Sequence, residues 1–144
     1  VRAREGVAVR LSERLLELGQ GVERQWDVRV TIEINCSTDG LAQSLSDELY
    51  RVVQEGVVNA ARHADASTIR VSLSLDDGCA SLTIADDGKG FPFSGVYDLA
   101  ALGRMDRGPV TPRERVAELR GNLTLSSATN VGTELVITVP LAHA

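Results

Sequence analysis

The stretch DELYRVVQEGVVNAARHA, residues 47–64, has the spacing of an amphipathic helix. Apolar or small residues recur every three or four positions, which predicts one face that packs in a core. These positions are Leu49, Val52, Val53, Gly56 and Ala60. Valine is a weak helix former, so packing rather than intrinsic propensity has to hold this segment. We therefore expect the rest of the chain to be arranged around it.

The same helix has a polar flank made of Glu55, Asn59, Arg62 and His63. Their offsets of four, seven and eight residues place a carboxylate, an amide, a guanidinium and an imidazole on one face. Glu55 and Asn59 supply oxygens of the kind that a hydrated Mg²⁺ accepts, and Arg62 could pair with a phosphate. The pattern also fits an ordinary solvated helix face.

The second polar stretch, Asp86-Asp87-Gly88-Lys89-Gly90, directly follows alternating apolar residues at positions 80–84. A carboxylate at the end of a strand can accept a hydrogen bond from an exocyclic amine such as that of adenine. Glycines next to it let the backbone approach a flat ligand. An Asp-Gly turn explains the stretch as well, and Asp87 is interpreted as a solvated turn residue.

A third pair, Gly132 and Thr133, begins the last apolar alternation of the chain. It could place a hydroxyl beside Asp86, although a tight turn explains Gly132 equally well.

The length of 144 residues predicts one domain, and its core should be aliphatic because aromatic residues make up only 3%. A net charge of -5 argues against a nucleic-acid surface. Cys36 and Cys79 match no metal spacing, which indicates buried or free thiols in a reducing compartment. No apolar run is long enough to span a membrane. The chain begins without Met, so we interpret it as a fragment of a longer protein.

Periodicity predicts the remaining elements. Helices are expected over residues 7–25, weakened or broken near Gly19 and Gly21, and over residues 112–120, ending at Gly121; Ser44 or Ser46 is expected to cap the central helix. Strands are expected over residues 28–34, 69–75, 80–84, 123–127 and 135–139, with a long loop over residues 91–111. The order predicts a two-layer α+β sandwich, in which three helices cover one face of a mixed, mostly antiparallel sheet of about five strands. Polar alternates such as Arg70, Ser72 and Ser74 are expected on the opposite face.

Four segments together resemble the ATP-binding catalytic domain of sensor histidine kinases, which share the Bergerat-type nucleotide fold with DNA gyrase, MutL and heat-shock-90 proteins. The segments are QEGVVNAARHA (54–64), IADDGKGF (84–91), RERVAELRGNLTLSS (113–127) and VGTELVITVP (131–140). The resemblance is strongest to the branch whose response regulators carry a helix-turn-helix output domain. It covers residues 45–141, and residues 7–34 fit the first helix and strand of that domain.

The resemblance implies binding of ATP with Mg²⁺ and phosphoryl transfer to a histidine on a dimerisation hairpin that this chain lacks. Asn59 would coordinate Mg²⁺, and Glu55 would position a metal-bound water or assist proton removal. Asp86 would read the adenine amino group and Thr133 would reach the base through water. Arg62 would contact a phosphate and His63 would line the nucleotide. The pocket wall would be shaped by Gly88 and Gly90, Gly108 would lie at the phosphate side, and residues 91–111 would form the ATP lid.

Two replacements depart from the family pattern at the phosphate side. Pro109 stands where a leucine with a free N–H is usual, and Pro112 replaces a methionine. They keep open a catalytically weak nucleotide-sensing or protein-binding module of the same fold. An anti-sigma-factor serine kinase is a further alternative, against which the Arg-Glu-Arg segment at residues 113–115 argues. The implied partners are ATP or ADP, the dimerisation domain and a response regulator, in the cytoplasm and without direct membrane or nucleic-acid contact.

Overall fold

The computed structural model describes residues 10–35, 41–63, 65–76, 78–89, 95–98, 101, 116–128 and 130–141, except for the side chains of His63 and Asp76. These residues form two helices and six strands: α1 (Leu11–Trp26), β1 (Arg29–Ile34), α2 (Gln43–His63), β2 (Thr68–Asp76), β3 (Cys79–Asp86), β4 (Gly95–Asp98), β5 (Asn122–Ala128) and β6 (Gly132–Pro140). A further helical turn covers residues 116–118.

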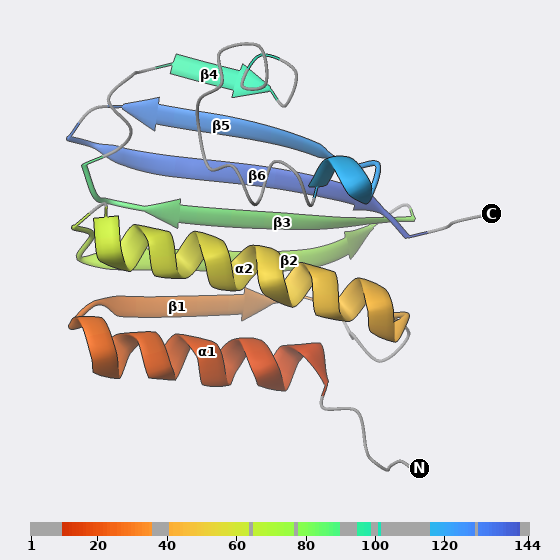
Figure 1. Ribbon diagram of the computed structural model, residues 1–144, viewed down its shortest axis with the longest axis horizontal. Helices are drawn as coiled ribbons and strands as arrows, with labels where there is room; N and C mark the ends of the chain where they lie inside the picture. Colours follow the sequence, from red (N-terminus) through yellow and green to blue (C-terminus); the bar gives the residue numbers. More distant parts are fainter. Residues whose placement is uncertain are drawn as a thin grey trace.

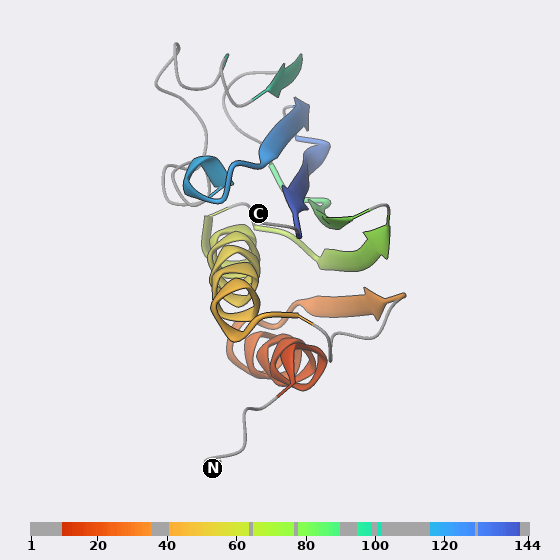
Figure 2. The same cartoon turned by 90° about the vertical axis from the view of Figure 1, so that its right-hand side faces the viewer.

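The strands form one mixed sheet in the order β1-β2-β3-β6-β5-β4. β1 pairs with β2 in parallel, and the other neighbours are antiparallel. Figures 1 and 2 show both helices and the helical turn on the same face of this sheet. The predicted two-layer α+β sandwich is therefore confirmed, with six strands in place of the expected five.

The additional strand, β4, lies inside the segment that was predicted to be a loop over residues 91–111. It pairs with β5 from Gly95 opposite Ser127 to Asp98 opposite Thr124. Four residues are too few to give a recognisable alternation, so only the pairing with β5 identifies this strand.

The alternation predicted for the strands agrees with the observed burial. The buried side chains of the four inner strands face the helices: Ile69, Val71, Leu73, Ala80, Leu82, Ile84, Leu123, Leu125, Leu135, Ile137 and Val139. Arg70 is exposed and Ser72 and Ser74 are half-buried on the other face, as expected. The core therefore lies between the sheet and its helix layer.

The helix was expected to be weakened or broken near Gly19 and Gly21, and α1 is continuous through both, so a break is wrong. Its buried stripe includes Gly19, where an added Cβ would lie 3.1 Å from Ile32 Cδ1. The glycine therefore allows the helix to pack closely on β1. Arg10 is extended, with φ −62° and ψ 144°, so the helix begins at Leu11 rather than at position 7.

α2 begins earlier than predicted, and neither expected serine caps it. The N–H of Ser46 already donates to the Ala42 carbonyl at 2.9 Å, so both Ser44 and Ser46 lie within the helix. Asp47 joins the two helices. Its Oδ1 lies 2.8 Å from the Arg14 guanidinium, which also covers the Tyr50 ring at 4.1 Å. The hydrogen bond from Arg14 lowers the pKa of Asp47.

The end of the third predicted helix lies where expected. The N–H of Gly121 donates to the Val116 carbonyl at 2.9 Å, and Arg120 adopts a left-handed φ of 59°. An added Cβ on Gly121 would run into the Thr138 carbonyl oxygen. Gly121 is therefore needed because the chain passes close to β6. Residues 111–115 lie outside the described part of the chain.

Candidate functional site

The apolar stripe of α2 fixes the direction of its polar flank. Val52, Val53 and Val57 are almost fully buried against the sheet, and all five residues of the predicted stripe are buried. At the edge of this contact Glu55 and Asn59 are half-buried, whereas Arg62 is exposed. The predicted flank therefore lies at the margin of the core.

Gly56 lets α2 approach the sheet next to Glu55. A Cβ at this position would lie 2.8 Å from Ile84 Cδ1 on β3. Ile84 precedes Asp86 by two residues, and Figure 1 shows α2 and β3 running in the same direction. Asn59 and Asp86 therefore lie toward the same end of two neighbouring elements.

Asp86 ends β3, and its carboxylate is half-buried. Its Oδ1 accepts a hydrogen bond of 2.8 Å from the N–H of Gly88, which is itself buried. Burial raises the pKa of the Asp86 carboxyl, and the charge of Asp87 acts in the same direction. Hydrogen bonds from the backbone N–H groups of Gly88 and Thr133 oppose that rise in the pKa.

Thr133 lies directly opposite Asp86 in the pairing of β3 with β6. The preceding residue, Gly132, has a φ of +144°, and an added Cβ would meet the Asp86 carbonyl oxygen. A side chain at position 132 would thus separate the two strands at this point. The structure brings Asp86 and Thr133 together, as the sequence predicted.

Asp87 makes structural hydrogen bonds that were not predicted from the sequence. It is exposed, but its Oδ1 accepts hydrogen bonds from the N–H groups of Ser67 at 2.7 Å and Thr68 at 2.9 Å. The bonds from Thr68 and Ser67 lower the pKa of the carboxyl. Asp87 therefore fastens the connection after α2 to the end of β3. No local pattern reveals this, because the partners lie far away in the sequence.

Several predicted site residues fall outside the described part of the chain. These are the side chain of His63, the glycines Gly90 and Gly108, the prolines Pro109 and Pro112, and most of residues 91–111. Cys36 is outside it as well, whereas Cys79 is a free, half-buried thiol.

The donor set on α2 fits a magnesium ion that keeps most of its water. Glu55 and Asn59 lie one turn apart and offer a carboxylate and an amide oxygen. The described residues contain no cluster of three or more His, Cys, Asp or Glu side chains. A cation at this flank would therefore need water and ligand phosphate oxygens to complete its shell.

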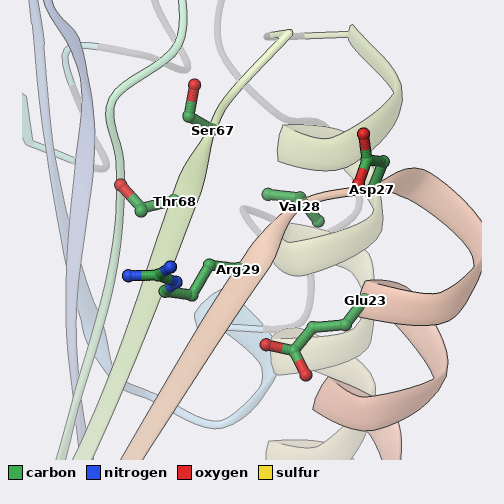
Figure 3. A pocket seen from close by; sticks show the side chains of 6 residues that line it. All are labelled: Glu23, Asp27, Val28, Arg29, Ser67 and Thr68. Atoms are coloured by element: carbon green, nitrogen blue, oxygen red, sulfur yellow. The ribbon is translucent and has the colours of Figure 1, made fainter.

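Two hollows lie away from this flank. The one in Figure 3 has a volume of about 550 Å³. It is lined by Glu23, Asp27, Val28, Arg29, Ser67 and Thr68. Another, of about 400 Å³, borders Asp86 and Asp87 together with Thr31, Thr68, Arg70 and Ala85. Neither has an α2 residue among its described lining, so neither is identified with the predicted site. Among the described helices, none is sufficiently long and apolar to cross a membrane.

Comparison with known proteins identifies relatives of the chain. The family described as histidine kinase-, DNA gyrase B-, and HSP90-like ATPase matches residues 44–143. Sensor histidine kinase MctS of Rhizobium johnstonii is 37% identical over 113 residues, which are 78% of this chain and 24% of that protein. Sensor histidine kinase LiaS of Bacillus subtilis is 28% identical over 126 residues, which are 85% of this chain and 30% of that protein. The chain thus spans less than a third of either relative.

Solved structures show the same fold. The histidine kinase domain of the blue-light activated histidine kinase from Erythrobacter litoralis EL346 superposes with a TM-score of 0.72 and 19% identity, covering 92% of this chain and 62% of that one. The ATP-binding domain of PrrB from Mycobacterium tuberculosis gives 0.68 and 18%, covering 95% of this chain and 98% of that one. Fold, matched residues and relatives agree: the chain belongs to the histidine kinase-, DNA gyrase B- and HSP90-like ATPase family, as a domain of the sensor histidine kinase type.

Proposed function

We propose that this domain binds ATP with Mg²⁺ and transfers the γ-phosphoryl group to a histidine on the dimerisation hairpin of its parent protein. The observation that carries the proposal is the meeting of Asp86 and Thr133 across β3 and β6, near the end of α2 that bears Asn59. A half-buried carboxylate there matches the exocyclic amine of adenine. The relatives, which are sensor histidine kinases, support the same reaction class.

One group of residues contacts the base, and another contacts the phosphates and the metal. Asp86 accepts a hydrogen bond from the adenine amine, and Thr133 reaches the base through water. Gly88 and Gly90 shape the pocket wall, and His63 lies along the nucleotide. The contacts with the base thus come mainly from Asp86 and Thr133, which lie opposite each other on β3 and β6.

On the phosphate side, Asn59 binds Mg²⁺ and Glu55 positions a metal-bound water or assists proton removal. Mg²⁺ supplies charge neutralisation at the phosphates when it is bound. Arg62 contacts a phosphate, and Gly108 lies in the lid formed by residues 91–111. Catalysis then depends mainly on positioning and electrostatics.

The proposed partners follow from this reaction. The acceptor histidine belongs to the dimerisation domain of the parent, and the phosphoryl group passes on to a response regulator. We place the domain in the cytoplasm, where ATP is available.

Magnesium dependence tests the site on α2. Calorimetric titration with ATP should give a measurable affinity in Mg²⁺ and a clearly lower affinity when EDTA replaces the metal, because Mg²⁺ neutralises phosphate charge. Asn59→Ala should remove most of that metal dependence, because the amide oxygen is lost. Gln54→Ala changes an exposed residue of the same helix and should behave as the wild type. A wild-type affinity that is equal with Mg²⁺ and EDTA would contradict the proposed metal site.

A further inference from the structure

Ser127 is a buried hydroxyl at the end of the core. Its side chain is 6% exposed, and among the described residues only Ser46 is a comparably buried polar group. Burial of a hydroxyl is unfavourable unless its hydrogen bonds are made. Ser127 occupies an inward position of β5, and the two preceding inward residues are leucines. A hydroxyl at this position is therefore expected in a polar environment.

The sheet register supplies that environment. Ser127 lies opposite Thr133 on β6, and Thr133 lies opposite Asp86 on β3. The neighbouring rows across the same three strands are apolar: Leu125, Leu135 and Ile84, then Leu123, Ile137 and Leu82. The helix-facing side of the sheet thus changes from aliphatic to polar at the row Asp86–Thr133–Ser127.

We propose that Ser127 is a positioning residue of the adenine site, which orients the Thr133 hydroxyl and thereby strengthens the selection of adenine over a 6-oxopurine. The inference rests on the proposed nucleotide binding. Directly opposed residues in an antiparallel pair have Cβ atoms about 4.5–5.5 Å apart, a distance over which serine and threonine hydroxyls form hydrogen bonds.

The orientation matters because a hydroxyl offers one donor and two acceptor sites. When Ser127 donates its proton to the Thr133 oxygen, the Thr133 proton is left to point toward the base, directly or through a water. Adenine presents an amine donor at position 6 and an acceptor at N1, which match the Asp86 acceptor and the Thr133 donor. A 6-oxopurine reverses both groups and meets an acceptor with a carbonyl and a donor with an N–H.

Calorimetric titrations of the 144-residue chain with ADP and with inosine diphosphate, both in Mg²⁺, test the proposal. Ser127→Ala should weaken ADP binding about 2- to 10-fold and leave the inosine nucleotide nearly unchanged, so the selectivity ratio falls by the same factor. Ser126→Ala is the matched control, because the neighbouring side chain lies on the open face of the sheet and should keep the wild-type ratio. Ser127→Cys is a second variant, for use if the alanine variant folds poorly. It nearly keeps the side-chain volume but has only a weak donor, so it should show the same fall in the selectivity ratio.

The possible outcomes separate this inference from the proposed function. A wild-type ratio in folded Ser127→Ala or Ser127→Cys overturns the role of Ser127. Equal weakening of both nucleotides also overturns it, because that result indicates a purely structural role. A wild-type chain that does not prefer ADP overturns the adenine site itself, and the inference with it.

Discussion

Asp86 has opposite consequences for folding and for binding. Burial raises the pKa of its carboxyl, so the folded state retains a proton at a pH where the unfolded state has already released it. The stability contributed by this group is therefore largest at low pH and falls as the pH rises between the unfolded and the folded pKa. Above both pKa values the ionised carboxylate lowers the stability of the fold, and the proposed adenine contact offsets this cost only when nucleotide is bound.

Asp86→Asn is expected to separate the two effects. Nucleotide binding should weaken by about 1–3 kcal/mol, because an amide then faces the adenine amine. The thermal midpoint without nucleotide should be unchanged or higher at neutral pH, because a partly buried charge has been removed. The affinity of the wild type for nucleotide should also decrease as the pH falls toward the raised pKa of Asp86. The affinity of Asp86→Asn should lack this pH dependence, because the amide does not titrate.

Titration calorimetry and thermal unfolding, each at several pH values, measure these effects. Equal nucleotide affinities of wild type and Asp86→Asn would rule out the proposed contact with the base.

At the same scale, Asp87 shows a role that its neighbours in the sequence do not predict. Asp86 and Asp87 are adjacent and chemically identical, yet one faces the proposed pocket and the other holds Ser67 and Thr68. The division of labour arises from the strand end, where alternation turns successive side chains in different directions. The motif therefore predicted a site at Asp86 and a solvated turn residue at Asp87, but not the hydrogen bonds that Asp87 accepts from Ser67 and Thr68.

At the scale of elements, patterns with several repeats were predictable and single events were not. The buried stripe of α2 and the alternation of β2, β3, β5 and β6 agree with the structure because burial imposes a period on the sequence. The start of α2 and the strand β4 were missed, since serines in a helix resemble caps and four residues show no period. The facing of Asp86 and Thr133 followed from the motif order, whereas the magnesium and phosphate contacts remain predictions.

The two glycines of α1 provide a test of packing against propensity. Gly21→Ala should stabilise the domain by about 0.5–1 kcal/mol, because nothing lies within 4 Å of the new methyl group and alanine is the better helix former. Gly19→Ala makes the same chemical change but brings the methyl group against Ile32 and Val30, at 3.1 and 3.3 Å. Gly19→Ala should therefore raise the free energy of unfolding by less than Gly21→Ala does, or lower it. Urea unfolding of both variants measures the difference, and equal gains would show that the contact between α1 and β1 is looser than described.

At the scale of the molecule, the proposed site joins segments that are distant in the sequence. α2, β3 and β6 each provide one part, and in the proposed reaction the acceptor histidine comes from the dimerisation domain of the parent protein. His63 ends the helix that carries Asn59, and under the proposed function it lies along the nucleotide rather than in line with the γ-phosphate. In-line geometry is what phosphoryl transfer needs.

The isolated chain should therefore bind ATP without labelling itself. Incubation with γ-labelled ATP and Mg²⁺ is expected to give no stable phosphohistidine. Addition of the parent's dimerisation hairpin as a separate polypeptide should produce labelled hairpin, and Asn59→Ala should reduce the label. Strong labelling of the chain alone would mean that the acceptor has been misplaced.

The strands at the two margins of the described sheet, β1 and β4, are also its shortest, with six and four residues. Arg29 and Glu33 on β1 and Asp98 on β4 are exposed and place charges along these margins. Fibril-like aggregation begins when unpaired strand edges of separate molecules join, and short charged edges are poor templates for it. Copies of this domain that are crowded together thus present only short, charged strand edges to one another, which disfavours pairing between their sheets.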